Sequence, residues 1–460
     1  MKAIHDHAHA LATGLAAIRE QYHLPQAFPP AVLEEAERAA KRTFPTHRDR
    51  SDQPFVTLDP TSSTDLDQAF AIESSGSDIL LHYAIADVAS FVDPGGTIDR
   101  EAWARGETVY LPDGKVGLYP PILSEGVASL LPDGPRPAVV FTVRIDPAGA
   151  VKLDAVERAI IRSRAKLGYA TVTPEQLPGE FFELARRIAA NEASRGASRV
   201  DPPQQEVVEL PDGSFALQFR TVSEAEIANA ALSLAANMAI ADTLYAHHTG
   251  LFRVMPDPDK RARRRVAESA KALGIDWPKE ESLQDLQRRL NPNDKAQAAL
   301  MLAIRRSGAH AAYEAYKDGE RPWHWAMAAT YVHATAPLRR LADRYVIEAA
   351  HAVANGLSVP EYAQQAFREL PAAMAKADAK AAQVGAAAVE LAEAVELQSR
   401  VGQTFDGQVT DIDQRGARVQ LCGEAIIIRV SLNAPAIGDR LRLKLVASDP
   451  AQRRTQFVLA

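Results

Sequence analysis

The sequence lacks the residues and runs that mark several large classes of protein. Its single cysteine, Cys422, excludes an intramolecular disulfide framework and a cysteine-rich zinc site. No run of about 18 apolar residues occurs, and polar side chains interrupt the N-terminal 20 residues, so neither a membrane span nor a signal peptide is expected. The twelve histidines include no HExxH-like ligand pair. These absences favour a globular protein of the reducing cytoplasm.

Positive charge is also scarce overall, since the formal net charge is -7. Net charge describes solubility and the long-range field, whereas a nucleic-acid site needs only a locally basic groove. Residues 401–460 carry eight lysines and arginines against six acidic residues, so this end of the chain is locally basic. A basic module of this kind is typical of nucleic-acid binding.

The 460 residues, 47% of them hydrophobic, predict two or three domains. Residues 1–50 have apolar side chains at helical spacing and predict a helical segment, with a helix-turn-helix-like arrangement as one form of it. Residues 51–400 begin with strand-like runs and continue with Ala-rich helical runs. Residues 401–460 contain five short strand-like runs separated by turns, which predicts a small barrel of the OB type. The expected fold class is therefore α+β with an all-β C-terminal barrel.

Individual elements are predicted from the same patterns. Strands are expected at 55–58, 79–85 and 138–145, and in the tail at 403–411, 416–421, 425–430, 439–446 and 454–459. Helices are expected at 223–247, 294–317, 338–354 and 371–398. The polar stretch 46–52 is expected to be a linker.

Three aspartates carry the clearest chemical signal. A β-rich run delivers Asp59 to a strand end, a Pro/Ser/Thr loop follows, and Asp65 and Asp67 then flank the apolar Leu66. Residues two apart in extended chain share a face, so both carboxylates point one way while Leu66 is anchored inward. Converging carboxylates repel one another unless a cation neutralises them, and oxygen ligands select Mg2+, Mn2+ or Ca2+ over zinc. Magnesium suits phosphate chemistry because it keeps waters and accepts phosphate oxygens.

Two other interpretations of the cluster can be compared with a magnesium site. One is an acidic surface loop that caps a helix. The other is an EF-hand calcium loop, which fails because Thr64 stands where the turn glycine belongs and Phe70 where the bidentate glutamate belongs.

The cluster and the segments around it resemble motifs of the ribonuclease II/ribonuclease R family. Short segments similar to family motifs occur in family order over roughly residues 51–460. They are Thr57-Leu58-Asp59 with Asp65-Leu66-Asp67-Gln68-Ala69, Tyr83–Val88, Tyr110-Leu111-Pro112, Ser129-Leu130 with Arg136, Lys166–Tyr169, Asn237, Leu251–Val254 and Thr335–Arg340. No single motif decides the matter, but the ordered set is specific.

The resemblance implies an RNB-type α+β catalytic domain over 51–400, with a deep channel for single-stranded RNA, and an OB-fold RNA-binding domain over 401–460. It implies Mg2+-dependent (or Mn2+-dependent), processive 3′→5′ hydrolysis of RNA to nucleoside 5′-monophosphates. The family usually places two cold-shock domains before the catalytic domain, and the helical residues 1–50 are expected in their place. The expected partner is single-stranded RNA, with no membrane and no organic cofactor, and the protein is expected to be a monomer.

Site roles carried over by the resemblance begin with metal binding by Asp59, Asp65 and Asp67. Gln68 occupies the position of the family's fourth aspartate and would be an uncharged, weaker ligand. Arg339 would stabilise charge on the scissile phosphate. Pro337 suits the first position of a helix, which would put Arg339 in the first turn. The alternative for Arg339 is a surface pair with a residue four positions on, Asp343.

RNA contacts are the remaining roles implied. Tyr110 and Tyr169 would stack on bases, unless either ring is simply part of the core. Arg340 and Glu226 are further candidates along the RNA path. Because Gln68 departs from the family pattern, a catalytically impaired RNA-binding protein of the same fold is the alternative function. A metal phosphohydrolase of small nucleotides is a third hypothesis, which the C-terminal barrel disfavours.

Overall fold

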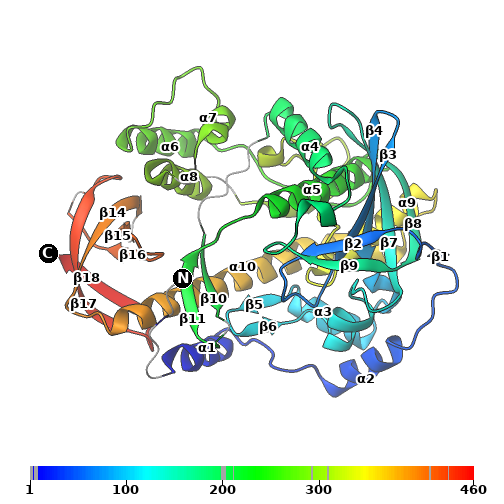
Figure 1. The fold of residues 1–460 in the computed structure, drawn as a ribbon, viewed down its shortest axis with the longest axis horizontal. Coiled ribbons are helices and arrows are strands. Elements are labelled where there is room, and N and C mark those ends of the chain that lie inside the picture. The colour runs from blue at the N-terminus through cyan, green and yellow to red at the C-terminus, as the bar shows by residue number, and fades with distance from the viewer. Residues whose placement is uncertain are drawn as a thin grey trace.

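The computed structural model describes residues 4, 9–197, 204–210, 212–291, 294–307, 310–413, 416–433 and 435–460. The chain forms a large sheet with helices packed on it and, at the opposite end of the molecule, a small β-barrel (Figure 1). A long helix, α10 (Glu361–Gln398), runs between the two. This confirms the α+β fold class and the C-terminal barrel predicted from the sequence.

The large sheet has seven strands in the order β1-β8-β7-β4-β3-β2-β9. Neighbours pair antiparallel, except that β1 lies parallel to β8 and β2 parallel to β9. The strands are β1 Arg48–Asp49, β2 Phe55–Asp59, β3 Gln68–Ser75, β4 Asp78–Ala86, β7 Arg136–Ile145, β8 Val151–Ile161 and β9 Ser163–Gly168. The central strands β4 and β7 are almost continuously apolar, as expected of strands that are buried on both faces.

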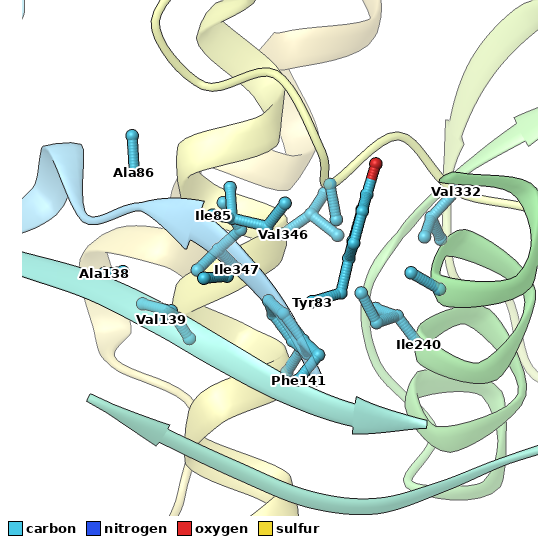
Figure 2. Packing of buried hydrophobic residues seen from close by; sticks show 14 of the residues in the cluster. Tyr83, Ile85, Ala86, Ala138, Val139, Phe141, Ile240, Val332, Val346 and Ile347 are labelled. Atoms are coloured by element: carbon cyan, nitrogen blue, oxygen red, sulfur yellow. The ribbon is translucent and has the colours of Figure 1, made fainter. Parts of the chain in front are cut away.

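Two helices cover the middle of this sheet, α5 (Glu224–Ala246) and α9 (Leu341–Ala354). Figure 2 shows Ile85 of β4 and Phe141 of β7 in one buried cluster with Ile240 of α5 and Val346 of α9. Within the described part of the chain, α5 is the one helix long and apolar enough to cross a bilayer. Because 72% of its apolar window is buried, we read α5 as the core helix of a globular domain.

The barrel at the C-terminal end has five strands in the order β16-β15-β14-β17-β18. Its strands are β14 Thr404–Asp413, β15 Gly416–Leu421, β16 Ile427–Val430, β17 Arg440–Asp449 and β18 Arg454–Leu459. All five predicted tail strands are therefore present, and they form a nearly closed, OB-like barrel. Its core is made by the inward side of each strand, as the alternating burial along β15 shows.

Smaller elements surround these two bodies. The helices are α1 Ala10–Gln21, α2 Pro30–Ala39, α3 Thr97–Arg105, α4 Phe181–Arg195, α6 Lys260–Ala272, α7 Leu283–Arg289 and α8 Lys295–Ser307. Two hairpins are formed by β5 Val109–Leu111 with β6 Gly114–Val116 and by β10 Gln205–Glu209 with β11 Phe215–Phe219, and a two-stranded antiparallel sheet joins β12 Leu251–Val254 to β13 Ala312–Ala315, which follows α6, α7 and α8 in the chain. Short helical turns occur at η1 Val88–Ser90, η2 Leu123–Val127, η3 Pro174–Gln176 and η4 Trp325–Met327.

Several predicted boundaries are wrong. The stretch 46–52 contains β1, which extends the main sheet, because its backbone pairs with β8 about 110 residues away in the chain. The predicted helix 294–317 ends at Ser307, and residues 312–315 form β13 because they pair with β12. Helix α10 begins ten residues earlier than predicted and continues through Pro371.

The N-terminal segment is helical as predicted, and its helices pack on other elements of the chain. Leu11, Leu15 and Ile18 of α1 pack in one apolar cluster with Leu391 and Val395 of α10. The carboxylate of Glu35 on α2 accepts hydrogen bonds from Thr97 at the start of α3. The helix-turn-helix-like arrangement stays a prediction.

Helix α10 is positioned by a close approach that only glycine allows. Gly106 follows α3 with φ +75, and a Cβ there would lie 2.5 Å from the Cβ of Ala377 on α10. We expect Gly106→Ala to lower the melting temperature more than Gly95→Ala, because Gly95 has a similar φ of +74 but nothing within 4 Å. Both variants carry the positive-φ cost of about 1–2 kcal/mol, so their difference measures the clash. Equal melting temperatures in a thermal scan would contradict this packing.

Candidate active site

The loop between β2 and β3 carries the three aspartates. Asp59 is the last residue of β2, and the chain then runs without strand pairing until β3 begins at Gln68. Leu66 is fully buried, as predicted, and its N–H donates to Ser129 Oγ at 2.8 Å while its carbonyl accepts from the Leu130 N–H at 2.9 Å. The loop is therefore fixed at its middle by hydrogen bonds that the Ser-Leu pair supplies.

Asp67 is the deepest of the three carboxylates. Its Oδ1 accepts the backbone N–H of Leu338 at 2.7 Å, and its Oδ2 lies 3.7 Å from Nε of Arg339. Burial raises the pKa of Asp67 to about 8, and Arg339 and the Leu338 N–H oppose this rise. An anion in this position is costly, and each additional positive charge near it makes the charged form more favourable.

Asp59 and Asp65 lie close enough to share this electrostatic environment. Burial raises the pKa of Asp59 to about 7, the charge of Asp65 raises it further, and Arg339 and Lys166 lower it. Asp65 forms an ion pair with Lys115 at 2.9 Å and accepts the hydroxyl of Tyr110 at 3.2 Å. The three predicted carboxylates are thus electrostatically coupled to one another around Arg339.

The donor chemistry of the cluster fits a hard divalent cation. Its groups are carboxylate oxygens, and two of them have raised pKa values that a bound cation would lower. Among the residues that the structure describes, no three His, Cys, Asp or Glu side chains are already arranged as a metal site. Asp65 is turned toward Lys115, which neutralises it in this state.

Arg339 lies in a turn before α9, not in its first helical turn. The prediction that Pro337 begins the helix is wrong, because α9 begins at Leu341 after an N-cap residue, Arg340, with extended backbone. Arg340 pairs there with Glu107 in an isolated β-bridge, which keeps its backbone out of the helix. The turn is closed by N–H groups of Arg339 and Arg340, which donate to the carbonyl of Ala336 at 3.2 and 3.0 Å.

The alternative pairing of Arg339 with Asp343 is also excluded. The fully buried carboxylate of Asp343 binds the guanidinium of Arg340 at 2.7 Å and caps the N–H of Ala336 at 2.8 Å. Arg339 is left with a side chain that is 48% exposed beside Asp67. The exposed guanidinium is the one available to a phosphate, whereas the contact with Asp343 favours a structural role for Arg340.

The two candidate stacking residues flank the carboxylates. Tyr110 lies on β5 with 51% exposure, so its ring is accessible while its hydroxyl is held by Asp65. Tyr169 directly follows β9 and is half-buried, and its hydroxyl accepts the Asn229 side-chain N–H at 2.8 Å. The backbone N–H of Tyr169 donates to the carbonyl of Asp59 at 3.1 Å, so Tyr169 is fixed beside the end of β2.

Gln68 and Glu226 are both engaged by neighbours within the protein. The amide of Gln68 donates to the carbonyl of Thr335 at 2.6 Å, and its side-chain oxygen, the predicted weak metal ligand, accepts the hydroxyl of Tyr83 at 2.5 Å. Glu226 pairs with Arg220 at the start of α5. The metal role of Gln68 and the RNA role of Glu226 stay predictions.

Sequence reasoning missed the cations that balance this site. Lys115 on β6 and Lys166 on β9 act on Asp65 and Asp59. Lys166 stands in a segment that resembles a family motif, so a signal was present, whereas Lys115 follows the motif containing Tyr110 and has no local signal. The backbone N–H of Leu338 was also missed, since no side-chain pattern reports it.

Comparison with known proteins shows the family of the chain. Residues 47–356 match the RNB domain, and residues 403–460 match the RNase II-type exonuclease C-terminal S1 domain. Ribonuclease R of Aquifex aeolicus is 26% identical over an alignment 500 residues long, and the alignment covers 96% of this chain and 69% of that protein. The chain belongs to the RNB family, whose members are hydrolytic 3′–5′ exoribonucleases that depend on divalent metal in general.

Solved structures show the same fold. Mycoplasma genitalium RNase R in complex with ribose-methylated single-stranded RNA matches with a TM-score of 0.87 at 22% identity, over 98% of this chain and 78% of that one. Yeast Ssd1, described as a pseudonuclease, matches with a TM-score of 0.69 at 17% identity, over 91% of this chain and 55% of that one. The fold is therefore shared by active and inactive proteins, and activity has to be argued from the site.

The raised pKa of Asp67 predicts how the metal-free protein responds to pH. A carboxyl group whose pKa is higher in the folded state stabilises the fold below its unfolded pKa, and this contribution is lost as pH rises through about 8. In EDTA, Asp67→Asn should therefore melt above the parent at pH 8, by at least about 2 °C, with a smaller difference at pH 5.

Thermal scans at the two pH values, with and without Mn2+, measure this effect. Mn2+ should raise the melting temperature of the parent at pH 8 and have less effect on Asp67→Asn. A variant that melts below the parent at pH 8 in EDTA would show that the buried carboxylate is not a source of strain.

Proposed function

We propose that this chain hydrolyses single-stranded RNA processively from the 3′ end, with Mg2+ or alternatively Mn2+, and releases nucleoside 5′-monophosphates. The observation that carries the proposal is that Asp59 and Asp67 both interact electrostatically with the exposed Arg339 and with Asp65, beside the accessible ring of Tyr110. Anionic oxygens for a cation, a guanidinium for a phosphate and an aromatic face for a base lie in one place.

The carboxylates are the residues that would hold the cation. Asp59, Asp65 and Asp67 offer hard oxygen ligands, and the cation when bound supplies an activated water and neutralises phosphate charge. The protein's own contribution is to hold Asp67 by the Leu338 N–H and the loop by Ser129, so that the ligands are fixed before substrate arrives.

Arg339 is the residue that would stabilise charge on the scissile phosphate. Its guanidinium carries five donors in a planar fork that matches phosphate oxygens. It stands beside Asp67 with about half of its side chain exposed, so a phosphate can reach it without displacing a buried ion pair. Its backbone is held in a closed turn, which places the charge where the reaction needs it.

Tyr110 and Tyr169 would receive bases on either side of the reacting phosphate. Aromatic stacking accepts any base and contributes about 1–3 kcal/mol per base. Hydrogen bonds from Tyr110 to Asp65 and from Asn229 to Tyr169 fix the two hydroxyl ends. Recognition by stacking suits an enzyme that removes nucleotides irrespective of sequence.

Basic surfaces away from the site supply attraction for the RNA backbone despite the overall negative charge. On α6, which is amphipathic, the exposed cations are Lys260, Arg261, Arg264, Arg265 and Lys271. On β17 of the barrel, Arg440, Arg442 and Lys444 alternate along one exposed face. Cations at these positions would release counterions from RNA and make binding dependent on salt.

The relatives support the same function. The solved Mycoplasma genitalium RNase R holds single-stranded RNA in the fold that this chain shares over 98% of its length. We further propose that the protein acts in the cytoplasm, since its single exposed cysteine suits a reducing compartment. We also propose that it acts as a monomer.

A second candidate is an RNA-binding protein of the same fold without nuclease activity. Gln68 in place of an aspartate removes one anionic ligand, and the resemblance to yeast Ssd1 shows that the fold persists without activity. The two candidates differ in whether RNA is cut when it is bound.

A labelled RNA of 20 to 30 nucleotides with Mg2+ separates them. We expect stepwise 3′ shortening that stops in EDTA, and no cleavage by Asp67→Asn with RNA affinity retained, because that change removes a ligand without touching the base-stacking residues. Asp133→Asn, which changes an exposed aspartate that pairs with Arg136, is the matched control and should cleave normally. Binding without cleavage by the parent would favour the second candidate.

The ring of Tyr110 is expected to contribute to RNA affinity and its hydroxyl much less. Tyr110→Ala should weaken RNA binding in EDTA by roughly 5- to 150-fold, equivalent to 1–3 kcal/mol, whereas Tyr110→Phe should stay within about threefold. Fluorescence anisotropy measures both. Equal losses in the two variants would indicate that the hydroxyl contact with Asp65, not stacking, accounts for the effect.

A further inference from the structure

We propose that Gln68 is a positioning residue that holds the Arg339 turn, and that the metal ligands are the aspartates without it. This inference deepens the proposed nuclease function and rests on it. Gln68 begins β3, immediately after Asp67, and its side chain reaches the carbonyl of Thr335 across a separation of 267 residues in the chain. It therefore connects the aspartate loop to the segment that carries Arg339.

Hydrogen bonding fixes which way the amide faces. The carbonyl of Thr335 only accepts, so the atom 2.6 Å from it must be the Nε2 donor of Gln68. The Oε1 atom then accepts the hydroxyl of Tyr83 at 2.5 Å. With a partner at each end, the side-chain oxygen of Gln68 is committed to Tyr83 and not directed at a cation.

Tyr83 gives this contact a rigid base. Its ring is fully buried in the apolar cluster between β4, α5 and α9, and Figure 2 shows its hydroxyl projecting from that cluster at the side near Val332. Burial raises the pKa of the Tyr83 hydroxyl well above its usual value, so it remains a neutral donor. Gln68 is thus held by the core of the domain.

The segment it holds is anchored on its other side by α5. Asn237 accepts the N–H of Ala334 at 2.9 Å, and Ser233 shares a 2.9 Å hydrogen bond with the hydroxyl of Thr335. Gln68 donates to the backbone carbonyl of Thr335, on the same residue whose hydroxyl Ser233 contacts. The turn that follows supplies the Leu338 N–H for Asp67 and presents Arg339, so fixing Thr335 fixes both.

An aspartate could not take this place. A carboxylate has no donor for the Thr335 carbonyl, and an anion there would face a carbonyl oxygen and lie next to Asp67. Its side chain is also one methylene shorter. Where the family pattern has a negative charge beside the proposed cation site, this chain therefore has a neutral side chain at residue 68 that holds the Arg339 turn.

Two variants and a matched control test the proposal in the full-length protein. Gln68→Met removes both hydrogen bonds at similar length, and Gln68→Glu keeps the acceptor for Tyr83 but loses the donor. The control is Gln364→Met on α10. The side chain of Gln364 also donates to a backbone carbonyl, that of Val359 at 2.8 Å. If Gln68→Met fails to fold, Gln68→Glu carries the test.

Three readouts are measured: amide hydrogen exchange of residues 334–340, Mn2+ affinity by calorimetry, and RNA affinity in EDTA. We expect exchange to accelerate about three- to tenfold in the Gln68 variants, as for loss of one net hydrogen bond, and RNA affinity to fall by a similar factor. We expect Mn2+ affinity in Gln68→Met to fall by no more than the factor by which exchange accelerates, because all three aspartates remain and Asp67 is affected only through the loosened Leu338 N–H. The control should change none of the three.

Unchanged exchange in both Gln68 variants would overturn the proposal, and so would a tenfold loss of Mn2+ affinity in Gln68→Met with exchange unaffected, which would make Gln68 a ligand. Failure of the proposed function has a different signature. If the parent bound neither Mn2+ nor RNA while exchange still accelerated in the variants, the positioning role would stand and the nuclease assignment would fall.

Discussion

The site depends on one hydrogen bond, from the N–H of Leu338 to the buried carboxylate of Asp67. It joins the loop before β3 to the turn before α9, two segments that are 271 residues apart in the chain. A buried polar group without a hydrogen-bond partner is destabilising, so this contact, together with the bond from Gln68 to Thr335, favours the two segments staying in contact. The position of Arg339 relative to the carboxylates follows from this contact, because Arg339 is the next residue after the donor.

The surrounding charges form a balance that is incomplete without a cation. Burial makes the anionic forms of Asp59 and Asp67 unfavourable, while Arg339 and Lys166 offset this in part and Lys115 is bound to Asp65. In the proposed function, binding of a divalent ion would release protons from Asp59 and Asp67 or free Asp65 from Lys115. A fourth carboxylate would add to this repulsion, and the neutral amide of Gln68 stands in its place with both ends hydrogen-bonded.

The sequence alone predicts what is local. Alternating burial in the tail strands and the apolar runs of β4 and β7 are properties of consecutive residues, and their predicted positions hold within a few residues. The start of α9 was misplaced because a proline at 337 suits a helix start, whereas the bridge between Glu107 and Arg340 holds the backbone extended. The grouping of the aspartates with Arg339 came from motif resemblance, and the backbone donor of Leu338 could not be predicted, since it depends on a tertiary contact.

Helix α10 sets a length scale for whatever the molecule binds. Its 38 residues correspond to about 57 Å at 1.5 Å per residue, and it packs against β13 and α9 and also against β17 and β18 of the barrel. A continuous helix of this length holds the barrel at a constant separation from the large sheet. If the barrel and the catalytic sheet both bind RNA, as proposed, a polynucleotide long enough to bridge that separation would be held at two places and a shorter one at the sheet alone, so the length of one helix would divide substrates by size.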